Sequence, residues 1–370
     1  MIKITNDLLY QLALTQVPQI GCVHAKLLIQ QFHSAEAIFK ARISDLEKTE
    51  GIGAVRAHCI KSFSNFVQLE KEIAFIEKYK IKPLFINEPQ YPQRLLHCYD
   101  SPTMLFYRGE TNLNAARVVA VIGTRINSPY GKQLTEKLVK ELAPYGVLVV
   151  SGLAFGVDAI AHRAAVNNNL PTVGVLAHGL DSIYPSEHAG LAKEMIKQGG
   201  GLLTEFNSDI TAEKHHFPVR NRIVAGMCDA VVVIETGTKG GSMITAELAN
   251  GYNRDVFAYP GKTTDAKSAG CNVLIKSNKA VLLTETHELA ESLGWVPAVS
   301  KKISPQKELF VHLNTEEKTI VEILQEKQSV HIDELNLRCG ISTSSIAAAI
   351  LNLELQNMVQ ALPGKMYKLT

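Results

Sequence analysis

The stretch Val118-Val119-Ala120-Val121-Ile122-Gly123-Thr124-Arg125 decides the fold, because an apolar run leads directly into a glycine, a threonine and an arginine. Similar short runs, rich in β-branched residues, recur along the chain at 147–150, 172–176, 201–204, 230–234, 256–259 and 281–283. Segments of helical length separate most of these runs. Nearly all-apolar strands that alternate with helices predict an α/β fold with a mostly parallel, Rossmann-like sheet, covered by helices on both faces. Ligands of such sheets bind beyond the carboxyl ends of the strands, so we expect the functional residues there.

The composition is that of an ordinary globular protein. The chain has 370 residues, of which 46% are hydrophobic and 20% are charged. This length predicts two or three domains, and the apolar fraction excludes wholesale disorder and fibrous classes. No run of about 18 uncharged apolar residues is present, so no membrane-spanning helix is predicted. The first residues lack the apolar core of a signal peptide, and we therefore expect a cytoplasmic protein.

Cysteine spacing and net charge exclude several classes of protein. The 38 basic and 36 acidic residues leave a net charge of +2, which argues against a sequence-wide polycation but permits a local basic patch. The cysteines are far apart and form no CxxC or Cys/His cluster, so neither a disulfide framework nor a zinc site is predicted. They are Cys22, Cys59, Cys98, Cys228, Cys271 and Cys339.

Residues 1–80 are predicted to form a helical domain. Two similar segments, 17–28 and 46–60, each place a glycine-bearing turn between helical patterns. They resemble the helix-hairpin-helix motif of SAM-like domains, whose turn offers backbone N–H groups to phosphate. A helical corner that serves only packing is an equally acceptable interpretation.

The remaining chain divides into a core, a linker and a tail. Residues 81–293 comprise a proline-rich connector and the α/β core, and the connector ends in an extended strand at 104–107. A linker is predicted at 294–312. Residues 313–370 give three short helical patterns and then two β segments, in the order of a winged helix. Its five basic and seven acidic residues, a net charge of −2, favour contact with protein, or packing, over DNA binding.

The turn after the first strand is suited to an anion but not to a dinucleotide. A dinucleotide site needs G-x-G-x-x-G, and only Gly123 is present, so NAD is disfavoured. Gly123 and Thr124 permit close backbone approach to a phosphate, and Arg125 adds a fixed cation. Ser151 and Gly152, after the second strand, are predicted to bind phosphate through backbone N–H groups.

Two nearby residues of the following segment have structural interpretations. Asp158 is predicted to cap the N-terminus of the helix at 159–166, rather than to act as a general base. His162, within that helix, is interpreted as a structural residue.

The segment 214–223, Lys-His-His-Phe-Pro-Val-Arg-Asn-Arg-Ile, carries the strongest functional signal. It places Lys214, Arg220 and Arg222 around the aromatic Phe217. Cations that meet phosphates and a ring that stacks on a base are the usual elements of single-stranded nucleic-acid binding. The structural alternative has Arg222 paired with a carboxylate and Phe217 in the core. The two histidines have no third ligand at a suitable spacing, so no metal is expected.

The loop after the fifth core strand is a second candidate anion site. Gly240, Gly241 and Ser242 open a helix, where backbone N–H groups form a cradle for phosphate. The order G-x-x-x-x-G-K-[ST] is absent, so ATP hydrolysis is not supported.

Together these blocks resemble the DNA-processing protein A (DprA/Smf) family, through 118–125, 151–162, 173–185, 202–206, 217–226, 240–246, 256–261 and 268–275. The resemblance implies a non-enzymatic, cofactor-free, cytoplasmic protein that binds single-stranded DNA during natural transformation. It also implies protection of incoming strands, help in loading the RecA recombinase, and a homodimer. By motif match, Arg125, Lys214, Phe217 and Arg220 would contact the strand. Asn253 and Asn278 replace common glycines of the family, but asparagine tolerates the left-handed turn.

Two other functions compete with this interpretation. The run 240–247 also resembles the G-G-x-x-T-x-x-E element of nucleoside-monophosphate phosphoribohydrolases, in which Glu247 could act as an acid or base. Glu247 has no partner carboxylate nearby in sequence. An adaptor protein, for which DNA binding is incidental, is the third possibility.

Overall fold

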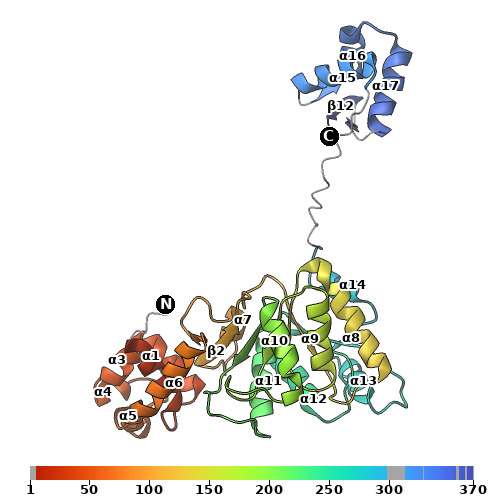
Figure 1. The fold of residues 1–370 in the computed structure, drawn as a ribbon. Coiled ribbons are helices and arrows are strands. Elements are labelled where there is room, and N and C mark those ends of the chain that lie inside the picture. The colour runs from red at the N-terminus through yellow and green to blue at the C-terminus, as the bar shows by residue number, and fades with distance from the viewer. Residues whose placement is uncertain (1–5, 298–312, 328, 356–357, 363–364, 370) are drawn as a thin grey trace. The chain divides into compact units, whose positions relative to one another are not determined.

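The computed structural model of the chain describes residues 6–297, 313–327, 329–355, 358–362 and 365–369. The chain separates into two compact units, Met1–Ser300 and Lys301–Thr370 (Figure 1). The first contains the helical segment and the α/β core. The second contains the predicted winged helix. Most of the predicted linker, 298–312, lies outside the described residues.

The described part of the N-terminal segment is helical, as predicted. Buried apolar residues, among them Leu12, Leu28 and Ile60, join its helices. The side chain of Ser34 caps one helix by accepting a hydrogen bond from the N–H of Ala37. The helices are α1 (Asn6–Gln16), α2 (Cys22–Phe32), α3 (Ala35–Lys40), α4 (Ile43–Leu46), α5 (Gly53–Lys61) and α6 (Phe66–Lys78).

Polar contacts fasten this helical segment to the core. Glu72 of α6 accepts hydrogen bonds from the hydroxyl of Ser208, at 2.5 Å, and from its backbone N–H. Lys26 of α2 donates to the carbonyl of Leu96 at 2.8 Å. The helical segment and the core therefore form one compact unit. That residues 1–80 are a domain that folds independently stays a prediction.

A nine-stranded sheet with the order β1-β2-β6-β5-β4-β3-β7-β8-β9 forms the core. The seven predicted core strands are present and parallel, and the connector adds two antiparallel strands at one edge. The strands are β1 (Lys82–Phe85), β2 (Met104–Gly109), β3 (Val118–Ile122), β4 (Leu148–Ser151), β5 (Thr172–Val175), β6 (Gly201–Thr204), β7 (Ala230–Val233), β8 (Asp255–Ala258) and β9 (Val281–Leu282).

Helices cover both faces of the sheet, because alternate residues of each strand point to opposite faces. Val119 and Val121 pack in one apolar cluster with α8 and α9, whereas Val118 and Ala120 pack in another that includes α11 and α12. Helices α8, α9 and α10 lie side by side (Figure 1). The helices are α8 (Pro129–Leu142), α9 (Val157–Asn167), α10 (Ala189–Lys197), α11 (His216–Gly226), α12 (Gly241–Gly251), α13 (Ala269–Lys276) and α14 (Thr286–Ser292), with short 3-10 turns at Ala143–Tyr145 and Ser186–His188.

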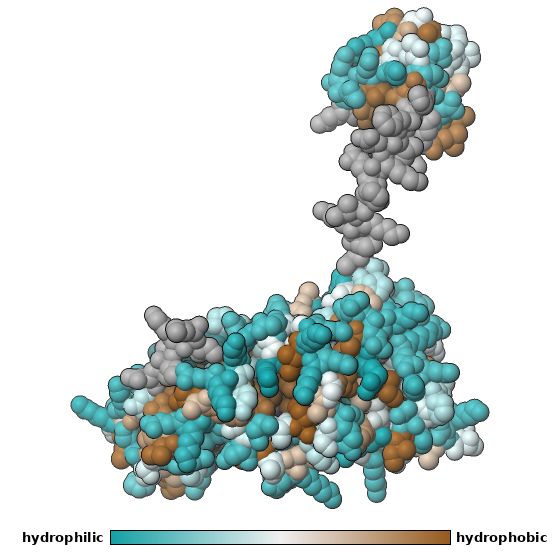
Figure 2. All heavy atoms as spheres, viewed as in Figure 1, coloured by the Kyte–Doolittle hydropathy of each residue, from teal (hydrophilic) through white to brown (hydrophobic). Residues whose placement is uncertain are grey.

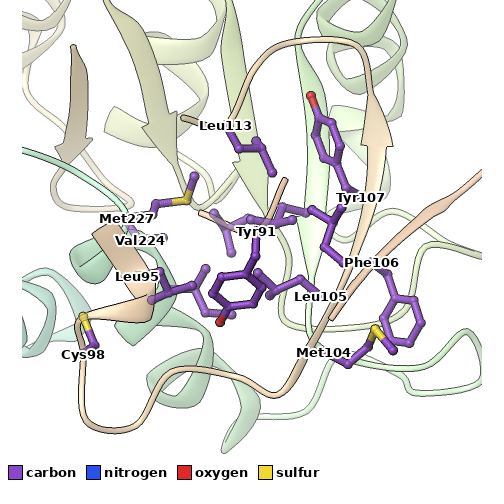
Figure 3. Packing of buried hydrophobic residues seen from close by; sticks show 14 of the residues in the cluster. Tyr91, Leu95, Cys98, Met104, Leu105, Phe106, Tyr107, Leu113, Val224 and Met227 are labelled. Carbon is purple, nitrogen blue, oxygen red and sulfur yellow. The ribbon is translucent and has the colours of Figure 1, made fainter. Parts of the chain in front are cut away.

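The connector is part of the core rather than a loose tether. Tyr91 is fully buried, and its ring lies beside Leu95 and Leu105 (Figure 3). Its hydroxyl donates to the carbonyl of Pro102 at 2.7 Å, which satisfies the buried polar group. Leu95 belongs to the short helix α7 (Gln93–Leu96).

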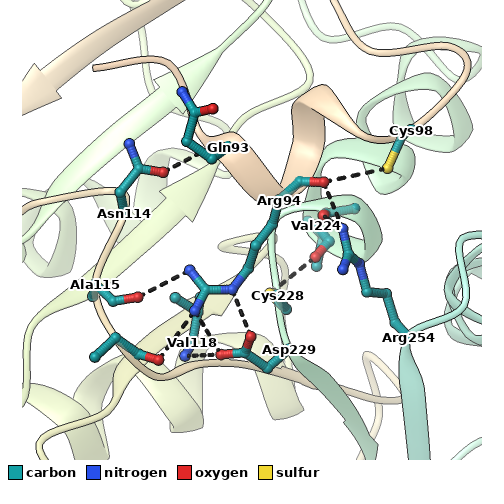
Figure 4. Close-up of polar contacts among 12 residues, drawn as sticks. Gln93, Arg94, Cys98, Asn114, Ala115, Val118, Val224, Cys228, Asp229 and Arg254 are labelled. Carbon is teal, nitrogen blue, oxygen red and sulfur yellow. Dashed lines mark hydrogen bonds and ion pairs between the residues drawn. The ribbon is translucent and has the colours of Figure 1, made fainter. Parts of the chain in front are cut away.

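An arginine fixes α7 to the start of two central strands. Arg94 makes a bidentate ion pair with Asp229, at 2.6 and 2.9 Å, and donates to the carbonyls of Ala115 and Ala116 (Figure 4). Asp229, just before β7, also accepts from the N–H of Val118 at 2.8 Å. This network fixes the amino ends of β3 and β7. The loops of the candidate site follow the opposite, carboxyl ends of the same two strands.

The second unit has the predicted winged-helix order. Three helices, α15 (Thr315–Glu326), α16 (Ile332–Cys339) and α17 (Thr343–Leu355), pack around buried apolar residues such as Ile320 and Ile346. A small antiparallel sheet has the order β10-β12-β11. Its strands are β10 (Val330–His331), which the sequence did not reveal, β11 (Val359–Leu362) and β12 (Met366–Leu369).

Candidate nucleic-acid interface

A pocket of about 730 Å³ opens at the carboxyl ends of the central strands. Strand order reverses at this point, because β4 lies on one side of β3 and β7 on the other. The helices that follow β3 and β7 pack on opposite faces of the sheet, and such a switch point leaves a crevice at the strand ends. Most of the predicted site residues line the pocket: Gly123, Thr124, Arg125, Gly152, Lys214, Phe217, Arg220, Gly240, Gly241 and Ser242.

Aromatic and cationic side chains meet at the rim of the pocket. The guanidinium carbon of Arg125 lies 5.1 Å from the centroid of the Phe217 ring, within cation–π distance. Phe217 is half-buried and Arg125 is exposed, so the ring and the cation both remain accessible. Lys214 is also exposed at this rim.

Two further residues lie at the rim, and the sequence did not single them out as site residues. Tyr184 is 52% exposed, and its ring centroid lies 5.9 Å from that of Phe217. Lys239 is exposed just before the glycine pair that opens α12. Both residues lie in loops that follow core strands, and this position could have marked them as candidate site residues. Sequence alone did not show that these loops converge on the loop of Arg125.

Arg220 lies at the floor of the pocket and is buried. Its guanidinium donates to the carbonyl oxygens of Gly152, at 2.5 Å, and of Val175. Burial lowers the pKa of Arg220 to about 10, and Asp158 opposes that shift, so the residue remains cationic at neutral pH. Arg220 holds the loop after β4, and its positive charge lies beneath the pocket.

Asp158 holds the same loop from the other side, and the prediction that it caps a helix was wrong. The N-cap of α9 is Gly156, and Asp158 lies within the first turn. Its carboxylate accepts the N–H groups of Gly152, at 3.1 Å, and of Ala154. Burial raises the pKa of Asp158, while Arg220 and these hydrogen bonds lower it.

The structure contradicts the prediction that Ser151 and Gly152 offer backbone N–H groups to phosphate. The N–H of Gly152 is already bonded to Asp158. Ser151 is fully buried in β4, does not line the pocket, and donates its hydroxyl to the carbonyl of Val121 at 2.7 Å. The prediction failed because the sequence does not show which groups a buried carboxylate already binds.

Arg222 was also predicted as a DNA contact, and its position contradicts this. It lies outside the pocket, where it pairs with Glu205 and donates to the carbonyl of Asp100. The side chains of Arg222 and Glu205 are only 13% and 14% exposed. The structural alternative, an arginine paired with a carboxylate, is confirmed for this residue.

A buried glutamate fixes the loop that carries Arg125. Glu235, two residues after the end of β7, accepts hydrogen bonds from the N–H and the hydroxyl of Ser128. Its backbone carbonyl accepts from the N–H of Thr124 at 2.7 Å. A Cβ at Gly131 would meet this carboxylate, so a larger residue there would have to displace the Glu235 side chain. Glu235 therefore holds residues on both sides of Arg125.

The N-terminus of α12 supplies the remaining wall. Gly240 has a φ of 150°, which favours glycine, and its chain turns directly into the helix. The side chain of Asn221 donates to the carbonyl of Gly241 at 3.2 Å, and the hydroxyl of Ser242 bonds that of Thr236 at 2.7 Å. First-turn N–H groups have no partner within a helix, so this end carries partial positive charge.

The sequence matches the model of the DNA recombination-mediator protein A family over residues 82–294. It also matches the DprA winged-helix domain over 305–365 and a helix-hairpin-helix motif over 8–72. The chain belongs to the DNA recombination-mediator protein A family.

Known proteins of the DprA family align with most of the chain. Protein Smf of a Synechocystis species is 32% identical, over 97% of this chain and 98% of that protein. The crystal structure of DprA from Streptococcus pneumoniae is 31% identical and covers 78% of this chain and 98% of that chain, with a TM-score of 0.66. A Helicobacter pylori DprA structure, described by its single-stranded DNA binding mode, is 32% identical and covers 59% and 98%, with a TM-score of 0.53.

The departures from the DprA pattern preserve the backbone. Asn253 and Asn278 both have a φ of 56°, in the left-handed region, as predicted for asparagine in place of glycine. Each follows the end of a helix, α12 or α13, so the substitutions leave the turns intact.

The residue expected to act in the competing enzyme lies away from the pocket. Glu247 is exposed on α12 and pairs with Lys279 at 3.3 Å. Among the described residues that line the pocket, the only carboxylate is Asp158, which is occupied by backbone N–H groups. Across the described ranges no group of His, Cys, Asp or Glu side chains could hold a metal ion, and no helix is long and apolar enough to cross a membrane.

Proposed function

We propose that this DprA-family chain binds single-stranded DNA in the pocket at the carboxyl ends of β3 and β7. The observation that carries the proposal is the Arg125–Phe217 pair, with Lys214 and Lys239 at the same rim. A base can stack on the accessible part of the Phe217 ring while the cations meet the neighbouring phosphates. The N-terminus of α12 offers further backbone N–H groups to a phosphate.

The rest of the proposal rests on family membership. The chain serves natural transformation in the cytoplasm, where it protects incoming strands and assists the loading of RecA. It acts as a homodimer. Its work is binding rather than catalysis, which is supported by the position of Glu247 outside the pocket and by the structural role of Asp158.

A salt titration of binding to labelled oligothymidylate tests the proposal. Single-strand binding that neutralises Z phosphates should give a slope of about −0.7Z in a plot of log K against log salt. Phe217→Ala should weaken binding by about 1–3 kcal/mol, the contribution of one stacked base, without changing the salt slope. The control is Lys193→Ala, which changes an exposed residue of α10 outside the pocket. Equal binding by the parent and Phe217→Ala would contradict the proposed site.

A further inference from the structure

A second hollow lies between α8 and α9, outside the pocket described above. Its volume is about 420 Å³, and cationic and amide side chains dominate its lining. Residues one turn or two turns apart share a face of a helix, so each helix presents a row of side chains to the hollow. The residues that matter are Lys132, Glu136 and Lys140 of α8, Arg163 and Asn167 of α9, and Asn127 in the loop before α8.

The cations of this groove are poorly compensated. Lys140 and Arg163 are exposed and have no ion-pair partner among the described residues. Lys132 faces Glu136 at 3.9 Å, a loose and exposed pair that contributes little. Three cations therefore share one carboxylate around a concave surface, which favours the binding of an anion.

The opposite side of α8 shows a different pattern. Lys137 pairs with Glu285 at 2.6 Å, and Thr286 at the start of α14 donates to Glu141. Acidic groups thus accompany the lysine that faces α14, whereas they are scarce on the side that faces α9. In Figure 2 the surface over α8 is mainly hydrophilic, so the groove lies on a solvated face. The excess of positive charge on α8 is therefore confined to the side that faces α9.

The groove begins where the DNA pocket ends. Asn127, which lines the groove, lies two residues after Arg125, which lines the pocket. Helix α9 borders both hollows, with Asp158 in the pocket and Ile160 in the groove. Ile126, between Arg125 and Asn127 in sequence, is 75% exposed and offers an apolar surface to a sugar or base. Lys132 and Lys140 are about 12 Å apart along the helix axis, enough to follow several phosphates.

We infer that the α8–α9 groove is a second binding segment for the sugar-phosphate backbone of the same single strand as it leaves the pocket. The strand would pass over Ile126 and place its phosphates against Lys132, Lys140 and Arg163. This inference rests on the proposed function. It predicts a binding site longer than the pocket, with an electrostatic outer part that lacks base stacking.

The test compares oligothymidylates of about 4 to about 16 nucleotides, the range of site sizes in single-strand-binding folds. The groove variant Lys132→Gln/Lys140→Gln/Arg163→Gln should bind the shortest oligomers like the parent. Its affinity should stop rising at a shorter length, and its salt slope on long oligomers should be shallower by about 2, for three phosphate contacts. The matched control Lys137→Gln/Lys193→Gln/Lys197→Gln removes three exposed lysines outside the groove and should retain the parent's length dependence.

The outcomes separate this inference from the proposed function. If the groove variant matched the parent in length dependence and salt slope, the inference would be overturned, and the groove would be left to another anionic partner such as an acidic protein segment. An equal loss of affinity for long oligomers in the groove variant and in the control would overturn the inference too. The effect would then reflect net charge alone. Failure of the parent to bind any oligomer would instead refute the proposed function. Because all six substituted side chains are exposed, unchanged thermal unfolding should accompany each variant.

Discussion

Arginines at the rim and at the floor of the candidate pocket lie in opposite environments. At the rim, Arg125 and Lys214 are exposed, and Arg125 lies over an accessible aromatic ring. At the floor, Arg220 is buried and donates to protein carbonyl groups. A buried arginine is costly unless its donors are satisfied, so its hydrogen bonds are committed to the fold. An exposed arginine keeps its donors available for a ligand. Burial, rather than residue type, therefore decides which arginine keeps its donors available to a ligand.

The largest expected effect comes from removing the floor cation. Arg220→Ala leaves Asp158 without its opposing charge and leaves buried carbonyls unpaired, so the free energy of unfolding should fall by about 3–5 kcal/mol. Urea unfolding followed by circular dichroism measures the change, with Arg125→Ala as the control that should unfold like the parent. A variant of Arg220 that kept full stability but lost DNA binding would show that the floor arginine is a direct contact.

Removing the rim cation should weaken DNA binding and leave the stability of the fold unchanged. Arg125→Ala should weaken binding of single-stranded DNA by about 10- to 100-fold, because a charge-assisted contact contributes roughly 1.5–3 kcal/mol. Its unfolding should not change, because Arg125 is exposed. Fluorescence anisotropy gives the affinity, and differential scanning calorimetry gives the stability. A loss of stability comparable with that of Arg220→Ala would remove the distinction between rim and floor.

The third prediction concerns the pH dependence of stability, to which the buried His162 contributes. His162 is fully buried beside Thr172, and burial lowers its pKa to about 3. The unfolded chain binds the proton near pH 6.5 and the folded chain does not, so stability is full above 6.5 and falls as the pH drops towards 3. The expected slope is about 1.4 kcal/mol per pH unit from this residue. Urea unfolding between pH 7 and 5 measures it, and His162→Gln should flatten the dependence. An unchanged slope in this variant would rule out His162 as the cause.

The smallest expected effect concerns the residue that positions the rim. Glu235→Gln keeps an oxygen acceptor but removes the charge that binds Ser128, so the Arg125 loop should loosen and affinity should fall only a few-fold, about 1 kcal/mol or less. The effect should vanish in an Arg125→Ala background, because Glu235 acts through that arginine. A double-mutant cycle on DNA binding measures the coupling. Additive losses would show that Glu235 affects binding by another route.

The sequence predicted the elements of the core well, for a physical reason. A parallel strand covered on both faces must be apolar at nearly every position, so the run 118–122 and its counterparts are visible without any structure. The left-handed turns at Asn253 and Asn278 were equally predictable, because few residue types accept that conformation. Edge strand β1 and the two-residue β10 were less visible, since each is short and only partly buried.

The sequence predicted where the candidate site lies, but not which of its arginines are bound within the protein. Arg220 could have been recognised as inward-facing, because it shares a helical stripe with the buried Ile223 and Val224, three and four residues later. Arg222 carried no such signal. Its partner Glu205 is distant in sequence, and only the folded chain brings the two together.

The sequence by itself determined the succession of strands along the chain, the covered parallel sheet and the position of the candidate pocket at the strand ends. These features follow from local patterns of apolar residues and glycines. Tertiary structure alone decided which cations are free. Arg125 keeps its charge at the surface, while Arg220 and Arg222 are bound by groups far away in sequence. Hydrogen-bond partners and burial are properties of the folded chain, and they separate the exposed Arg125 from two arginines whose donors are bound within the protein.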